Sequence, residues 1–165
     1  MFDLEPFVSN DHKFLSIDKD DKNNRLKIRH DIENFQSACD SIGGREQMKK
    51  INDSGLKEYY VNGAYIRELF IPKDTAMVTQ LWKKDRFWII PFGDVTIVSE
   101  TYKKRVKGPY TEMVEPGSKI ALYTHEDTLW FAISGASNID SAEEELIAKS
   151  YKEITYSWGE SWHGE

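Results

Sequence analysis

Cysteine and histidine are scarce in this sequence. Its 165 residues include one cysteine, Cys39, and four histidines. A single cysteine cannot form a disulfide within the chain, and one cysteine with four histidines does not make the ligand spacings of a zinc finger. We therefore expect the protein to reside in a reducing cytoplasm, or in a particle that is assembled there.

Long apolar runs and a positive charge balance are also missing. No stretch of 18 apolar residues occurs, so we expect no membrane-spanning helix. The first residues, MFDLEPFVSNDHKF, lack a basic segment followed by an apolar run, so they do not resemble a signal peptide. Because the formal net charge is −6, we expect neither a general nucleic-acid binder nor attraction to an anionic membrane.

What the sequence does contain is a regular series of β-like segments. The segment AYIRELFIP, residues 64–72, places Tyr65 and Arg67 on one face and Glu68 on the other. Further segments are AMVTQLW, RFWIIPF, DVTIVSE, YTEMVE, SKIALYT and TLWFAIS, and they are separated by residues typical of turns. Short strands at roughly 8–12-residue spacing predict a sandwich or a barrel.

A helical pattern precedes these strands, and residues 1–29 are expected to be a polar arm rather than core. Over about residues 30–52 one helical face would carry Ile32, Phe35, Cys39 and Ile42. Gly43-Gly44 interrupts the pattern, which predicts either one helix ending there or two short ones. On that face Cys39 is read as a small buried hydrophobe, with a reactive thiol as the alternative.

A second helix is expected after the strands. Ser141 followed by Glu144 predicts a capping box, and Leu146, Ile147 and Ile154 would dock this helix on the barrel. The tail TYSWGESWHGE carries Trp158 and Trp162, which would dock on the barrel or on a partner. The predicted division is 1–57 for the arm and first helix, 58–136 for the barrel, and 137–165 for the last helix and tail.

Four blocks in order resemble the small cupin-like proteins that are common in bacteriophage genomes. They are NGAYIRELFIPKDT, KKDRFWIIPFGDV, KGPYTEMVEPGSK and YTHEDTLWFAI, and together they span about residues 60–135. The resemblance implies a double-stranded β-helix: a mainly β, cupin-like jelly-roll barrel, here with an N-terminal helical arm and a C-terminal helix. It also implies pairing of barrels, so we expect a homo-oligomer.

The resemblance also indicates where a metal would be held. Many cupins bind a divalent metal inside the barrel through three histidines and a glutamate, and the phage relatives tend to read His-Lys-x-x-His before the Gly-Asp turn. This chain has Trp82 and Arg86 in those two places, and no histidine closely follows Pro116-Gly117. Since Trp and Arg do not ligate divalent metals, we expect lost ligands, no metal and no cofactor.

Trp82 and Arg86 are instead candidate ligand-binding residues. If both point into the barrel mouth, an aromatic wall stands beside a fixed cation, which suits a stacked ring carrying a phosphate or a carboxylate. In the alternative, Trp82 fills the former metal cavity and Arg86 pairs with Asp85 or Glu68. The deciding observation is whether a cavity is present beside Arg86.

Three further residues complete the candidate site: Tyr65 and Arg67 on the first barrel strand, and His125. His125-Glu126-Asp127 forms a predicted turn, in which the histidine could act as a base, could belong to a weak metal site, or could simply be solvated. Separately, TYKKRVKGPY at 101–110 concentrates Lys103, Lys104, Arg105 and Lys107. It is read as a solvated loop or as a local patch that attracts anions.

Two functions from different classes follow. We favour a non-catalytic phage binding protein, which acts as a virion or assembly accessory or captures a host factor or a small anionic ligand. It would reside in the host cytoplasm or the virion, with a protein partner or a small anion and with no membrane. The alternative is a metal-independent sugar-nucleotide or nucleotide-processing enzyme, with His125 or Tyr65 as acid/base and Arg86 or Arg67 as the anion anchor.

Overall fold

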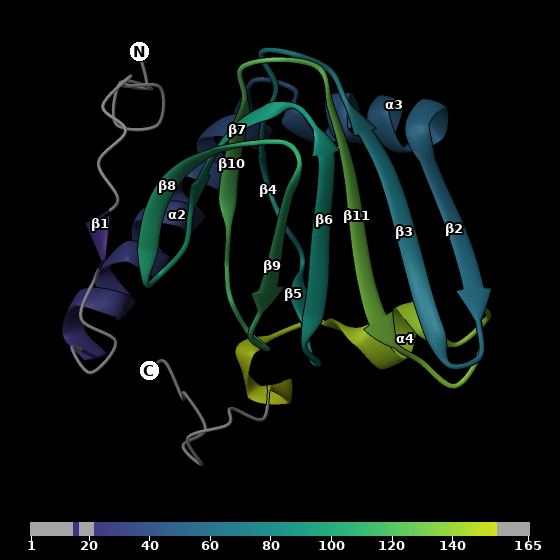
Figure 1. Ribbon diagram of the computed structural model, residues 1–165. Coiled ribbons are helices and arrows are strands. Elements are labelled where there is room, and N and C mark those ends of the chain that lie inside the picture. The colour runs from purple at the N-terminus through teal and green to yellow at the C-terminus, as the bar shows by residue number, and fades with distance from the viewer. Residues whose placement is uncertain (1–14, 17–21, 155–165) are drawn as a thin grey trace.

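Two antiparallel sheets form the centre of the computed structural model, which describes residues 15–16 and 22–154 (Figure 1). The first sheet has five strands in the order β1-β8-β7-β10-β4, and the second has five in the order β2-β3-β11-β6-β9. The first consists of β1 (Leu15–Ser16), β8 (Tyr102–Lys107), β7 (Asp94–Val98), β10 (Ala121–Thr124) and β4 (Ala76–Val78). The second consists of β2 (Leu56–Val61), β3 (Ala64–Ile71), β11 (Thr128–Gly135), β6 (Arg86–Phe92) and β9 (Tyr110–Val114).

The chain crosses repeatedly between the two sheets. It runs from β3 in the second sheet to β4 in the first, then from β6 to β7, from β8 to β9 and from β10 to β11. Side chains that alternate inward from both sheets form the core, in which Ile90, Val95 and Ile97 are fully buried. The predicted fold class, a mainly β jelly roll with helices at both ends, is confirmed by this topology.

The turn between β6 and β7 depends on a glycine. Gly93 has φ +127°, a conformation that a side chain rarely adopts, and a Cβ at this position would clash with Thr128. The next residue, Asp94, is held by Arg105 and Lys107 on the neighbouring strand β8. The Gly-Asp pair of the sequence is therefore a tight turn followed by a bonded carboxylate.

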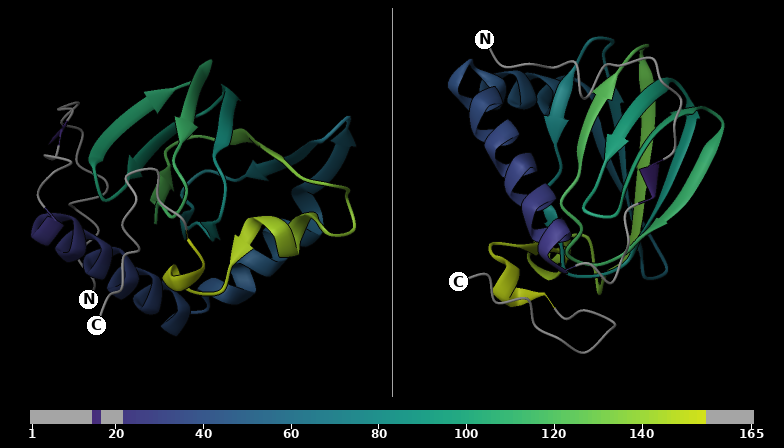
Figure 2. Two further views of the ribbon diagram at one scale, coloured as in Figure 1. Left: turned by 90° about the horizontal axis from the view of Figure 1, so that it is seen from below. Right: turned by 90° about the vertical axis from the view of Figure 1, so that its left-hand side faces the viewer.

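Two helices lead into the barrel, α2 (Lys22–Ser41) and α3 (Gly44–Gly55), and Gly43 between them has φ +93°. The two-helix alternative is the one the structure adopts. Ile32 and Phe35 of α2 are buried against Ala121 of β10, so this helix covers the outer face of the first sheet (Figure 2). Cys39 is half-buried at that contact, and burial together with Asp40 raises the pKa of its thiol.

Three expectations about local structure are wrong. Residues 22–29 belong to α2 rather than to an irregular arm, and Arg29 is buried. Ile42 is 86% exposed, because the helix ends at Ser41 and the chain turns before α3. The segment 102–107 is the paired strand β8 rather than a loop, since its basic side chains bond to carboxylates on β7 and β9.

The C-terminal part is shorter and less regular than predicted. Helix α4 covers only Ala142–Leu146, followed by β12 (Ile147–Ala148), which pairs with β5 (Leu81–Trp82), and by the 3-10 turn η1 (Tyr151–Glu153). The predicted capping box is wrong, because the Ser141 hydroxyl donates to Glu145 rather than capping the helix. Leu146 and Ile154 are buried, as a docking face requires.

Trp158 and Trp162 lie outside the described residues. The proposed domain limits at 57/58 and 136/137 stay predictions. Within the part of the chain that the structure describes, none of the helices has the length and apolar character needed to cross a lipid bilayer.

Candidate binding cavity

A cavity of about 460 Å³ lies between the inner face of the second sheet, strands β4 and β10, and helix α3. Because side chains alternate along a strand, Arg67, Leu69 and Ile71 of β3 point into the cavity. Glu68 points to the other face, where it bonds to Lys57 and Tyr59. Helix α3 closes one side with Met48 and Asn52. The cavity therefore results from barrel and helix together.

Arg86, the first residue of β6, lies in the cavity wall and is only 1% exposed. Its guanidinium carbon is 5.4 Å from the ring centroid of Trp82 and 5.3 Å from that of Trp88, distances at which a cation is attracted by the ring face. Both terminal nitrogens, Nη1 and Nη2, are buried without a hydrogen-bond partner among the described residues. Burial lowers the pKa of Arg86 to about 10, so the side chain is still charged at neutral pH.

Trp82 is a wall of this cavity rather than a plug. It is 4% exposed and packs against Tyr65 and Leu146, among other residues, while the space beside Arg86 stays open. The alternative in which Trp82 fills the cavity and Arg86 pairs with Asp85 or Glu68 is therefore wrong. Glu68 is bonded elsewhere, on the outer face of the sheet.

Tyr65 and Arg67 are close to the same cavity. Arg67 lines it and donates from Nη1 to Oε1 of Gln80 over 3.3 Å. Tyr65 is buried, and its hydroxyl is hydrogen-bonded to the carboxylate of Glu58, which pairs with Arg67 in the β2–β3 register and also lines the cavity. Burial and this hydrogen bond raise the pKa of Tyr65, so its hydroxyl stays protonated at neutral pH.

The structure places His125 away from the other four candidate residues. Leu122 points into the cavity, so by alternation His125 lies on the opposite face of the chain with Tyr123, whose ring centroid is 5.0 Å from its own. Nε2 of His125 is 2.8 Å from Oγ1 of Thr96. Burial and the nearby Arg105 lower the pKa of His125, which makes it a neutral turn residue rather than part of the cavity.

The basic segment is largely occupied by internal ion pairs. Arg105 donates to both carboxylate oxygens of Asp94, over 2.7 and 2.9 Å, and Lys104 donates to Glu112 over 2.6 Å. Lys107 also lies 3.4 Å from Asp94. These pairs hold β8 on the barrel, and the segment is not a free cationic loop.

Several wall residues were not foreseen from the sequence. Trp88 and Trp130 meet edge to face with ring centroids 4.6 Å apart, and Glu58 and Glu143 add two carboxylates. The place of Trp88 in the wall could be predicted, because Trp88 lies two residues after Arg86 on the same strand and so shares its face. Glu143 and the residues of α3 have no such signal, since they reach the cavity only through long-range packing.

Carboxylates and histidines do not gather into a metal site here. Across residues 15–16 and 22–154, no group of three or more His, Cys, Asp or Glu side chains is placed to hold an ion. The two places that the resemblance associates with metal ligands hold the indole and the guanidinium described above.

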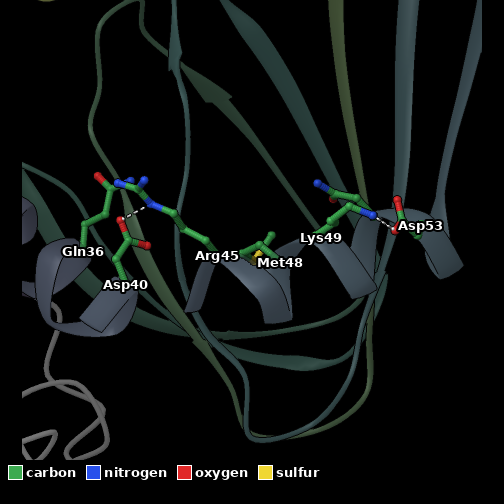
Figure 3. A pocket seen from close by; sticks show the side chains of 7 residues that line it. Gln36, Asp40, Arg45, Met48, Lys49 and Asp53 are labelled. Atoms are coloured by element: carbon green, nitrogen blue, oxygen red, sulfur yellow. Dashed lines mark hydrogen bonds and ion pairs between the residues drawn. The ribbon is translucent and has the colours of Figure 1, made fainter. Parts of the chain in front are cut away.

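A second hollow lies on helices α2 and α3, and Figure 3 shows its polar lining. Arg45 bonds to Asp40 over 2.9 Å and Lys49 to Asp53 over 2.6 Å. The side chains of Arg45 and Lys49 are 83% and 77% exposed. Because the charged side chains of this hollow are paired and exposed to solvent, they do not require a ligand to satisfy them.

Compared by sequence, the chain matches no family model and no curated protein. Among solved structures it is similar to a cupin superfamily protein of Desulfitobacterium hafniense, at 11% identity and a TM-score of 0.43 over 51% of this chain and 80% of that one. It is also similar to KdgF from a Halomonas species, at 12% identity and a TM-score of 0.45 over 52% and 80%. An RmlC-like cupin of Methanocaldococcus jannaschii has 13% identity and a TM-score of 0.43 over 48% and 77%. Likenesses this low say nothing about the chemistry of the cavity.

Proposed function

We propose that this cupin-like barrel binds a small anionic ligand in its cavity, with Arg86 as the charge that holds it. One observation carries the proposal: Nη1 and Nη2 of Arg86 are buried in the cavity wall, and no described residue is their hydrogen-bond partner. Leaving a buried polar group unsatisfied costs about 1–3 kcal/mol, and more when the group is charged. An anion at the guanidinium would supply the missing acceptors.

The size and the lining of the cavity support the same function. Ligand pockets commonly measure about 300–1,000 Å³ and combine apolar walls with a few polar groups. Here Trp82, Trp88 and Trp130 supply rings, and Leu69, Ile71 and Met77 supply aliphatic surface. Such a wall would bury the body of the ligand while Arg86 holds its charge.

The enzyme alternative is less well supported by the same geometry. His125, one proposed acid/base, lies outside the cavity, and among the described residues no histidine lines it. Tyr65 faces Glu58 and has a raised pKa, which disfavours a role as a base. We therefore propose binding rather than catalysis as the activity of this site.

Thermal-shift measurements with a panel of anions test the proposal. The panel contains benzoate, phenylacetate, phenyl phosphate, inorganic phosphate and AMP, and it is applied to the wild-type protein, Arg86→Met and Arg45→Met. At 100 times its dissociation constant a ligand stabilises the folded state by about 2.7 kcal/mol. We expect at least one anion to stabilise the wild type and Arg45→Met but not Arg86→Met, and equal shifts in all three proteins would refute the role of Arg86.

The biological setting stays a prediction. A phage source, a role as virion or assembly accessory, capture of a host factor, and residence in the host cytoplasm or virion rest on the resemblance alone. They do not affect the chemistry proposed for the cavity.

A further inference from the structure

We infer that the ligand of the cavity is a planar monocarboxylate with an apolar body, such as an arylcarboxylate. This inference rests on the proposed binding function and narrows it to one chemical class. It depends on the donor geometry at Arg86, on the charge balance of the wall, and on the apolar surface around both.

The donor geometry matches a carboxylate. Both terminal nitrogens of Arg86 lack a hydrogen-bond acceptor among the described residues, and they form the planar fork that pairs with the two oxygens of a carboxylate. The groups flanking this fork are the rings of Trp82 and Trp88, which contribute aromatic faces at 5.4 and 5.3 Å. A phosphate presents a third oxygen that also requires a donor, whereas a carboxylate is satisfied by the fork.

The charge balance of the wall favours a single negative charge. Arg67 and Arg86 contribute two positive charges, and Glu58 and Glu143 contribute two negative charges. A monoanion adds one charge to this balanced set, directly at Arg86. AMP or a pyrophosphate-linked sugar nucleotide would bring about two negative charges into a cavity that already contains two carboxylates.

The remaining surface suits an apolar, flat body. Trp88 and Trp130 are 2% and 6% exposed, and Ile71 and Leu122 are 1% and 3% exposed, so this part of the wall is apolar and buried. Aromatic ligands pack well against such rings in stacked or edge-to-face geometry. The sugar hydroxyls of a nucleotide would lose their hydrogen bonds to water there.

Isothermal titration with matched ligands tests this inference. Benzoate and phenylacetate are compared with phenyl phosphate, with benzyl alcohol, which lacks the charge, and with AMP. We expect the carboxylates to bind at least about tenfold more tightly than phenyl phosphate, and benzyl alcohol not to bind measurably. Arg86→Met should weaken carboxylate binding about 100-fold, and Arg86→Lys, which keeps the charge but loses the fork, about tenfold.

A second variant separates charge balance from geometry. Glu143 is exposed on α4 at the cavity, so Glu143→Gln should fold normally and should improve binding of phenyl phosphate more than that of benzoate. If phosphates or nucleotides bind more tightly than carboxylates and still depend on Arg86, the proposed function stands and this inference fails. If no anion of either class binds, both fail.

Discussion

Two arginines are buried among the described residues, and their surroundings are opposite. Arg29 of α2 is 8% exposed; it donates to Glu100 over 2.8 Å and to the carbonyl of Gly117 over 3.4 Å, and its guanidinium carbon lies 3.8 Å from the ring centroid of Tyr151. Arg86 is 1% exposed, and its two terminal nitrogens have no hydrogen-bond partner within the described structure. The first arginine fastens the helical segment to the barrel, and the second faces a cavity.

The difference between the two arginines is the basis for proposing that Arg29 is structural and that Arg86 binds a ligand. A buried charge is tolerated when partners satisfy it, and removing one partner then strands the other. A buried charge without partners destabilises the free protein, so it is expected to have a use that the free protein does not show. Substitutions at the two arginines should therefore change stability in opposite directions.

The largest change in the free energy of unfolding is expected at Arg29, whose guanidinium is hydrogen-bonded. Arg29→Met should lower the free energy of unfolding by about 3–5 kcal/mol, because Glu100, 3% exposed, loses its cationic partner. Urea unfolding followed by tryptophan fluorescence measures this. Arg29→Met combined with Glu100→Gln should recover part of the loss, and an additive double variant would contradict the coupling.

At Arg86, whose terminal nitrogens lack partners, the change in the free energy of unfolding should have the opposite sign. Arg86→Met should raise the free energy of unfolding of the ligand-free protein by about 1–3 kcal/mol, because an apolar side chain replaces an uncompensated buried cation. The same urea titration measures it. A loss of stability as large as that of Arg29→Met would mean that Arg86 is a structural residue after all.

A third charged residue, Asp94, tests whether an ion pair makes the stability of the fold depend on pH. The bond to Arg105 lowers the pKa of Asp94, so its contribution to stability is present at neutral pH and is lost as the pH falls through the lowered folded value. Asp94→Asn should cost about 1–2 kcal/mol at pH 7, and the difference from the wild type should shrink below about pH 4. Acid titrations of both proteins check this, and a constant difference down to about pH 2 would contradict it.

The smallest effect is expected where an ion pair is exposed. Arg45 pairs with Asp40 in the hollow on the helices, but its side chain is 83% exposed. Arg45→Ala should change the free energy of unfolding by less than about 0.5 kcal/mol. A larger effect would show that pairing, rather than burial, distinguishes the arginines.

Most of the barrel could be predicted from the sequence, because its strands are half-buried and alternate clearly. All seven predicted segments contain strands, from β3 to β11. Strand β8, YKKRVK, has the sequence of a solvated loop, because its charges conceal a pairing with carboxylates that lie elsewhere in the chain. Composition alone does not show that a charged segment has its counter-ions across a sheet.

The cavity could be predicted only in part. The resemblance to the phage cupin-like proteins singles out Trp82 and Arg86 before the Gly-Asp turn, and alternation places Tyr65 and Arg67 on one face of their strand. The side of the cavity that α3 closes and the carboxylate of Glu143 depend on packing between distant segments, which a local sequence pattern does not predict. The chemistry of His125 makes it a candidate, but the backbone direction at the end of β10 turns it away from the cavity.

Urea unfolding of the wild type and of Arg86→Met, each with and without phenylacetate, tests the central claim most directly. We expect a crossing: Arg86→Met is the more stable protein without the ligand, but at 100 times the wild-type dissociation constant it gains only about 0.4 kcal/mol, whereas the wild type gains about 2.7 kcal/mol. Equal gains in both proteins, or no gain in either, would contradict it.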